Sequence, residues 1–276
     1  METLLTRRHA NNHSFIILSI LFIIATPAAA LDQQQNRGIS MKIGLSMADI
    51  NYEEQPVGAE THTEEGTLPG VYVSFKGQQE RLYGEMVIHY YNGTADYVGQ
   101  AQDTPGNYLG LINTETETEL VDLNYRVGGY INRELEMYGG VGYRYWRRDI
   151  NAARLPDNSP VEGQLQRFTW FYGLLGANYH FYRRPNLDVA LSLQARRMIN
   201  PQVNVKNTTV SNNIDIDETW GYQVSLPVMV KISSSYFLTI EPFAKQWKLD
   251  QANDASGNFV PQNESNTYGI HFILSW

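Results

Sequence analysis

Histidine and carboxylate side chains are the residues of this chain best suited to acid–base chemistry. Hydrolysis needs a histidine within hydrogen-bond reach of a carboxylate that orients it, or of a serine that it activates. Neither His62 nor His89 has an Asp beside it in a recognisable motif, and the pair Asp215 and Asp217 has no neighbouring histidine. We therefore predict no catalytic site and no enzyme, although a His–carboxylate contact at His62 or His89 would favour one.

Two further histidines lie in segments that read as strands. His271 and Ser275 share one face of a strand, but four residues of strand separate them by about 13 Å, too far for direct proton transfer. We interpret His271 as a hydrogen-bonded interior residue. His180 falls near a predicted short turn.

The composition excludes several other kinds of site. The 276 residues include no cysteine, so disulfides, thiolate metal sites and cysteine nucleophiles are absent. A sequence pI near 5.3 argues against a nucleic-acid partner, which needs a basic face. We predict neither a cofactor nor a metal site. The mean hydropathy of −0.37 disfavours helical membrane spans.

The amino-terminal segment has the layout of a secretory signal peptide. Arg7 and Arg8 precede an apolar run over 15–26, and Ala28 and Ala30 form an Ala-x-Ala cleavage motif. The run is shorter than the roughly 20 residues of a spanning helix. The sequence thus predicts a cleaved signal peptide at 1–30 and one exported domain at 31–276.

The rest of the chain alternates apolar and polar residues with the period of a β-strand. We predict an all-β fold, a closed antiparallel up-and-down transmembrane β-barrel of ten strands, with eight or twelve left open. The predicted strands lie at about 39–47, 71–76, 82–90, 121–128, 135–145, 165–180, 187–194, 220–230, 236–247 and 268–276.

Short and long connections between these strands alternate. Short turns are predicted at 77–80, 132–134, 182–186 and 233–235, and long loops at about 50–69, 92–117, 148–164, 199–215 and 249–265. This places all tight turns at one end, as in outer-membrane barrels with short periplasmic turns and long external loops. Pro227 and Pro242 fall on one hairpin and predict a local break or bulge in its ladder.

A water-soluble barrel is the alternative for the same strands, but the polar faces are rich in Gly, Ser, Asn and Gln and carry sparse, mixed charge. That composition suits a crowded hydrated interior, and the opposite faces form a nearly uncharged band. Aromatic residues near strand ends are predicted to form two interfacial girdles. They are Tyr90, Tyr91, Tyr130, Trp146, Trp170, Tyr179, Trp220, Tyr236, Trp247 and Trp276.

The last strand ends on an aromatic residue. Tyr268, Ile270, Phe272, Leu274 and Trp276 share one face, which resembles the terminal strand signal of bacterial outer-membrane β-barrel proteins. The resemblance implies recognition by the barrel-assembly machinery, an outer-membrane location, and outer-membrane lipids and lipopolysaccharide as partners. Ten strands also invite comparison with the omptin proteases, which carry paired Asp residues and an Asp–His pair at the external rim. This chain lacks that pattern, because no Asp accompanies His62 or His89 in a recognisable motif and no histidine lies beside Asp215 and Asp217.

Polar faces that point inward would place a mixed set of charges in the lumen. Unpaired charges are costly in a narrow interior, so we expect them to pair and fill the barrel. The predicted lumen network comprises Lys42, Glu85, His89, Asp122, Arg126, Glu136, Arg144, Asp188, Arg196, Glu241, Lys245 and His271, with Lys76 and Lys231 beside it. This favours a structural or surface-binding protein over a small selective channel or a membrane-embedded hydrolase.

The predicted external loops are strongly acidic. Only Arg154 and Lys206 oppose their acidic residues, so the loops could concentrate divalent cations, engage the bridging cations of lipopolysaccharide or meet a basic partner; mobile, soluble loops are the alternative. The acidic residues are Glu53, Glu54, Glu60, Glu64, Glu65, Asp96, Asp103, Glu115, Glu117, Asp149, Asp157, Glu162, Asp215, Asp250, Asp254 and Glu264.

Overall fold

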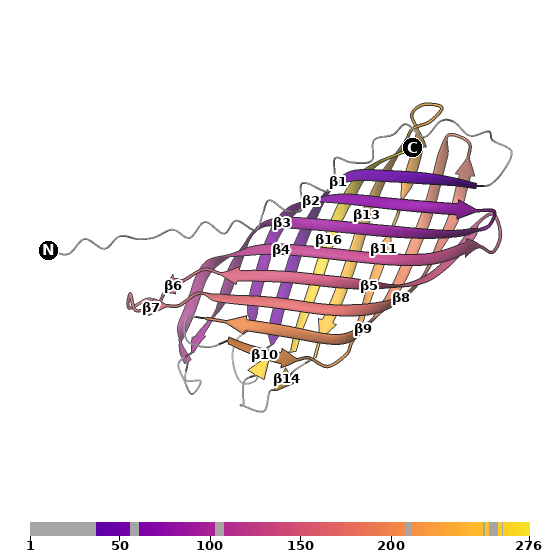
Figure 1. The fold of residues 1–276 in the computed structure, drawn as a ribbon. Coiled ribbons are helices and arrows are strands. Elements are labelled where there is room, and N and C mark those ends of the chain that lie inside the picture. Colours follow the sequence, from indigo (N-terminus) through magenta and orange to yellow (C-terminus); the bar gives the residue numbers. More distant parts are fainter. Residues whose placement is uncertain are drawn as a thin grey trace, which may run out of the picture. The chain divides into compact units, whose positions relative to one another are not determined.

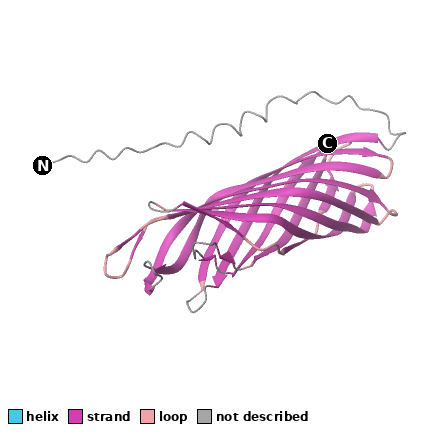
Figure 2. Ribbon diagram, turned by 60° about the horizontal axis from the view of Figure 1, so that its bottom comes forward, coloured by secondary structure: helices cyan, strands magenta, loops and turns pink. Residues whose placement is uncertain are grey.

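Long antiparallel strands make up most of the described chain (Figure 2). The computed structural model describes residues 37–55, 61–102, 108–207, 211–250, 252–253, 259–260 and 262–276, so the predicted signal peptide lies outside the described residues. The principal strands are β1 (Arg37–Gln55), β2 (His62–Gln79), β3 (Leu82–Gln102), β4 (Tyr108–Tyr130), β5 (Leu135–Ile150), β8 (Gln164–Arg184), β9 (Leu187–Lys206), β11 (Trp220–Ser225), β13 (Phe237–Leu249) and β16 (Gln262–Ser275).

These strands close into a ring of ten (Figure 1). Each pairs with its neighbour in chain order, β8 pairs with β9, and β16 pairs with β1 from Lys42↔Ser275 to Gln55↔Gln262. The predicted all-β, closed, antiparallel barrel is therefore confirmed. No helix in the described ranges is long and apolar enough to cross a membrane.

One position in the ring is occupied by three successive segments. β10 (Ser211–Asp215) pairs with the far end of β9, β11 follows, and β12 (Val228–Lys231) completes the position between β9 and β13. Pro227 lies in the break between β11 and β12, as its missing N–H predicts. The Pro227 carbonyl still accepts a hydrogen bond from the Ala190 N–H at 3.1 Å, and the Leu226 N–H donates to the Pro242 carbonyl at 3.0 Å.

Short turns join the strands at one end, at the right of Figure 1, and we call it the short-turn end. Local side chains hold these turns: the Asn132 Oδ1 accepts the N–H groups of Glu134 and Leu135 at 2.8 and 2.7 Å, and the Ser233 Oγ accepts that of Tyr236 at 3.2 Å. The opposite, long-connection end carries small hairpins such as β6 (Ala153–Arg154) with β7 (Pro160–Val161) and β14 (Ala252–Asn253) with β15 (Phe259–Val260).

The strands reach much further toward the long-connection end than the sequence predicted. Residues predicted for the first two long loops continue the ladders of β1 to β4, since Glu53 pairs with Thr63 and Asp96 with Glu115. Ten of the predicted loop acids therefore lie on strands. They are Glu53, Glu54, Glu64, Glu65, Asp96, Glu115, Glu117, Asp149, Asp215 and Glu264. Glu60, Asp103 and Asp254 lie outside the described residues.

The outer face of the barrel changes character along its length. Nearer the short-turn end it is an apolar belt, whose exposed members include Leu45, Met47, Val71, Met86, Leu123, Tyr125, Val127, Met137, Val141, Leu175, Leu193, Tyr222, Val224, Tyr268 and Phe272. Nearer the long-connection end the same face is a polar wall, formed by Asp49, Asn51, Glu53, Glu65, Thr67, Asp96, Glu115, Glu117, Glu119, Arg147, Asp149, Arg167, Lys248, Glu264 and Asn266. On β1 the change falls between Met47 and Asp49, and on β5 between Tyr145 and Arg147. A few exposed apolar side chains, such as Val98, Leu111 and Ile199, lie beyond it.

Candidate functional site: the filled lumen

The predicted polar faces do point inward, and their charges pair in layers. Nearest the short turns, the Glu85 carboxylate accepts hydrogen bonds from Lys42 Nζ at 3.1 Å and Arg126 Nη2 at 2.7 Å. The Ser74 hydroxyl donates to the same carboxylate at 2.7 Å. Glu85 is buried, and three donors from β1, β2 and β4 replace the water that it loses.

A second group at the same end surrounds His180. The His180 Nδ1 lies 2.8 Å from Asp188 Oδ1, and Arg183 Nε donates to the other oxygen of Asp188 at 3.0 Å. The other imidazole nitrogen of His180, Nε2, is 3.9 Å from Glu136 Oε2. Glu136 also accepts hydrogen bonds from the Tyr83 hydroxyl and from Asn178. The pairing of His180 with these carboxylates was not predicted from the sequence. It depends on the turn between β8 and β9, which places Asp188 beside His180.

The middle layer gathers three cations around one carboxylate. Arg144 Nη1, Arg196 Nη1 and Lys245 Nζ lie 3.3, 3.0 and 3.3 Å from Asp122 Oδ2, and the Tyr172 hydroxyl donates to Oδ1. All four charged side chains are buried, Asp122 at 0% exposure. We call these four residues the Asp122 cluster. Its formal charge is +2, because one carboxylate faces three cations.

Aromatic and histidine rings lie beside the Asp122 cluster. His271 Nδ1 is 2.7 Å from the Ser46 hydroxyl, and its ring stacks on Phe243 with centroids 4.4 Å apart. His271 is thus buried in the lumen with the Ser46 hydroxyl as its partner. His89 packs against Tyr72 and Tyr91 at centroid distances of 5.1 and 6.4 Å. Glu241, the remaining predicted lumen acid, accepts a hydrogen bond from Ser225 at 2.6 Å.

The layer toward the long-connection end was not predicted from the sequence. Arg148 Nε donates to Glu64 Oε2 at 2.8 Å and Arg148 Nη1 to Glu54 Oε1 at 3.1 Å, and its guanidinium lies 3.9 Å from the Tyr52 ring centroid. His62 Nδ1 lies 3.2 Å from the other oxygen of Glu54. Glu54 and Glu64 were predicted to lie in an external loop, but β1 and β2 extend past them and turn them into the lumen.

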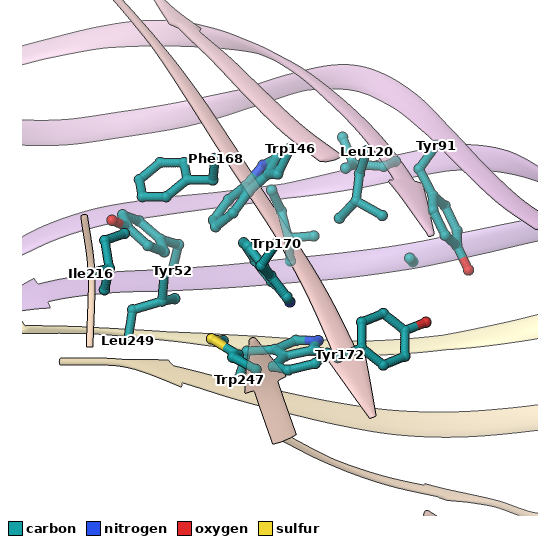
Figure 3. Close-up of a cluster of buried hydrophobic side chains, with 14 of the residues drawn as sticks. Tyr52, Tyr91, Leu120, Trp146, Phe168, Trp170, Tyr172, Ile216, Trp247 and Leu249 are labelled. Carbon is teal, nitrogen blue, oxygen red and sulfur yellow. The ribbon is translucent and has the colours of Figure 1, made fainter. Parts of the chain in front are cut away.

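Large aromatic side chains fill the space between the middle and far layers (Figure 3). The Trp170 and Trp247 rings meet edge to face at 5.4 Å, and Trp146 packs against Tyr52 at 5.1 Å. We call Tyr52, Trp146, Phe168, Trp170, Tyr172, Trp247 and Leu249 the aromatic plug; all are at most 2% exposed. Burying side chains of this size leaves little room for a water path.

The aromatic plug corrects one prediction. Trp146, Trp170, Trp247 and Tyr91 were placed in interfacial girdles, but they point into the lumen. Their place in the strand decides this: Trp146 lies between Arg144 and Arg148 on the inward face of β5. Other predicted girdle residues do face outward, with exposures of 45% to 49%. They are Tyr179, Trp220, Tyr236 and Trp276.

A hollow of about 730 Å³ lies mainly on the outer face of the barrel. Most of its lining consists of outward-facing side chains across β5, β8, β9, β11, β13 and β16, among them Met137, Leu193 and Tyr222. The small residues Ala195 and Ala244 line the same hollow. The inward-facing side chains of Gln194, Gln223 and Lys245 complete its lining.

Metal ligands do not gather in the lumen: no group of three or more His, Asp or Glu side chains in the described ranges could hold a metal ion. Two histidines pair with carboxylates in the manner of a general base and its orienting group. They are His62, whose Nδ1 lies 3.2 Å from Glu54, and His180, whose Nδ1 lies 2.8 Å from Asp188.

No protein-family model matches the chain, and no curated protein is similar to it in sequence. Among solved structures, the outer-membrane protease OmpT from Escherichia coli is similar with a TM-score of 0.60 and 10% identity, over 90% of this chain and 99% of OmpT. The fold is that of an outer-membrane β-barrel.

Other outer-membrane proteins are more distant in fold. The attachment invasion locus protein Ail of Yersinia pestis has a TM-score of 0.34 and 8% identity, over 86% of this chain and 98% of Ail. The toluene transporter TbuX of Ralstonia pickettii has a TM-score of 0.40 and 8% identity, over 86% of this chain and 88% of TbuX. The likeness to solved structures extends to the fold, and the narrower family is unassigned.

Proposed function

We propose that this protein is a non-conducting barrel of the bacterial outer membrane that presents its polar wall and long connections as a binding surface. The filled lumen carries the proposal. Ion-paired layers at Glu85, Asp122 and Arg148 follow one another along the axis, and the aromatic plug occupies the space between the last two. A structural or binding role suits such an interior better than transport or catalysis.

The apolar belt is the part that would face lipid. Outer-membrane barrels carry an apolar band flanked by aromatic residues, with short turns on the periplasmic side. Here Trp220 and Tyr179 lie exposed on the outer face, and the short turns are on the belt side of the molecule. The predicted signal peptide and terminal strand signal agree with export and assembly into this membrane.

The polar wall would then project beyond the membrane. Its hydrogen bonds join neighbouring strands, as between Thr67 Oγ1 and Asp49 Oδ1 at 2.5 Å and between Asn51 Nδ2 and Glu65 Oε1 at 3.2 Å. Strands hold these carboxylates in fixed rows, which a mobile loop would not. Such rows suit divalent cations that bridge to lipopolysaccharide phosphates, or a basic protein partner.

Planar-bilayer recording tests the closed lumen. The refolded barrel should give no steady conductance, whereas the double variant Trp170→Ala and Trp247→Ala should open a measurable pore by removing the aromatic plug. A control pair on the outer face, Trp220→Ala and Tyr179→Ala, should stay silent. Steady conductance of the unchanged protein would instead favour the small selective channel.

Binding by the polar wall is tested with lipopolysaccharide vesicles. In magnesium, the barrel should bind more tightly than its Glu53→Gln, Glu65→Gln, Glu117→Gln variant, and a chelator should remove the difference. Equal binding of both proteins would contradict a role for these carboxylates.

Hydrolysis is the second candidate, because a carboxylate orients His62 as in a general-base pair. Its other ring nitrogen, Nε2, is buried without a hydrogen-bond partner, so a substrate would need to displace the surrounding residues to reach it. Peptide or ester cleavage that His62→Gln abolishes, with unchanged heat-dependent gel migration, would establish this activity and replace the binding role.

A further inference from the structure

The surplus charge of the Asp122 cluster needs a counterion. Three cations and one carboxylate leave +2 in a buried region, and the adjacent rings of His89, His271 and Phe243 carry no compensating negative charge when the histidines are neutral. Lys245 can remove one positive charge by releasing its proton, but the guanidinium groups of Arg144 and Arg196 cannot. At least one positive charge remains, and burying it alone is costly.

A small cavity adjoins this surplus. Two of the three cations, Arg144 and Lys245, lie in its wall, with Tyr91, Thr267 and Phe243. The remaining lining is apolar: Ala48, Ile50, Leu68 and Leu120. Figure 3 shows Tyr91 and Leu120 side by side at this place next to the aromatic plug. No carboxylate lines the cavity.

Polar atoms of the same wall lack partners. Arg144 Nε and the Thr267 hydroxyl are both buried and make no hydrogen bond. An N–H of a guanidinium can only donate, and a hydroxyl can donate to an acceptor placed beside it. Buried donors of this kind are rare unless an unseen acceptor satisfies them.

The size of the cavity limits the acceptor. It offers about 10 Å³ to the centre of a water-sized particle, which is room for about one such particle. Phosphate, sulfate and carboxylate groups are too large. A neutral water would satisfy the donors but would leave the surplus charge. A halide ion is only slightly larger than a water molecule, and it would both accept the hydrogen bonds and offset the charge.

We propose that the cavity lined by Arg144, Lys245, Tyr91 and Thr267 binds one halide ion, with chloride as the natural ligand class. The ion lies between the Asp122 cluster and the aromatic plug and neutralises part of the surplus charge. It thereby stabilises the Asp122 cluster, which has one carboxylate for three cations. The proposal does not depend on the binding role of the polar wall.

Bromide tests the site directly. Crystals of the full-length barrel grown or soaked in sodium bromide should show an anomalous peak within contact distance of Arg144 and Thr267. Crystals in sodium gluconate should lack it. A bromide crystal with density for water and no anomalous peak would overturn the proposal.

Thermal unfolding in detergent gives a second readout at constant ionic strength. The unfolding midpoint should rise with chloride or bromide relative to gluconate, and the concentration dependence gives an apparent halide affinity. Thr267→Val, which keeps side-chain shape and charge, should weaken that affinity about tenfold, the usual worth of a hydrogen bond to a charged group.

Thr116→Val is the matched control, because Thr116 is equally buried, also lacks a hydrogen-bond partner and does not line the cavity. It should keep the full halide effect. Equal midpoints in all three salts for the unchanged protein, or equal losses of halide affinity in both variants, would contradict a halide at this position.

Discussion

The two halves of the barrel have the same kind of interior and opposite exteriors. From Glu85 to Arg148, buried ion pairs and aromatic rings lie on the inner face in both halves. The outward-facing residues change from Val141 and Leu123 in the apolar belt to Arg147 and Glu117 in the polar wall of the same strands. Packing within the ring thus dictates the inner face, whereas the surrounding solvent dictates the outer face.

Removing the central carboxylate should have the largest effect. Asp122→Asn leaves Arg144, Arg196 and Lys245 buried without their shared partner, so we expect a loss of about 3–5 kcal/mol in the free energy of unfolding. Urea titration in lipid vesicles, followed by tryptophan fluorescence, measures it. Asp149→Asn in the polar wall should cost less than about 1 kcal/mol. Equal losses would refute the distinction between interior and exterior.

A charge placed in the apolar belt should have the next largest effect. Val141 is 61% exposed on the outer face, and Val141→Arg should cost about 2–4 kcal/mol in vesicles if lipid surrounds the belt. Glu117→Arg, on the polar wall of the neighbouring strand, should change stability by no more than about 0.5 kcal/mol. A harmless Val141→Arg would mean that the belt faces water.

The smallest effect concerns Glu264 on the polar wall. A hydrogen bond from Asn266, together with Gln246 and Lys248, holds the pKa of the Glu264 carboxyl below its usual value of 4.5. A depressed carboxyl pKa stabilises the fold above the unfolded pKa, and that stability is lost as the pH falls through the folded pKa. Glu264→Gln should therefore lower stability by less than about 1 kcal/mol at pH 7 and have no effect well below pH 4. Stability curves of both proteins between pH 3 and 7 measure this; a difference that persists at low pH would assign the loss to packing.

Strand alternation predicted the fold and most of the lumen. The inward positions of Glu85, Asp122 and Arg144 follow from period two, and their pairing follows from the cost of unpaired buried charge. Which acid would meet which base did not follow, because that depends on the stagger between strands. Asp122, for example, meets Lys245 from nearly half the chain away.

The sequence-based assignment was wrong for residues where the position near a strand end, or a polar local composition, was given more weight than strand alternation. Trp146 follows Arg144 on the same face, so its parity already pointed inward, but its place near a strand end suggested an interfacial girdle. Glu54 and Glu64 likewise continue the inward parity of Ser46 and Leu68, and polar composition suggested a loop. A polar composition alone could not distinguish a loop from a strand that extends beyond the apolar belt toward the long-connection end.

The pairing of β1 with β16 also has a consequence for how the molecule forms. The pairing of Lys42 with Ser275 joins residues that lie almost a whole domain apart in the sequence. Because the entropic cost of closing a loop grows with its length, we expect the barrel to close late in folding. Until β16 arrives, β1 remains an unpaired edge, which is the kind of surface on which chains aggregate. A barrel of this design must therefore be kept from folding prematurely, and its final strand sets the moment at which the wall becomes complete.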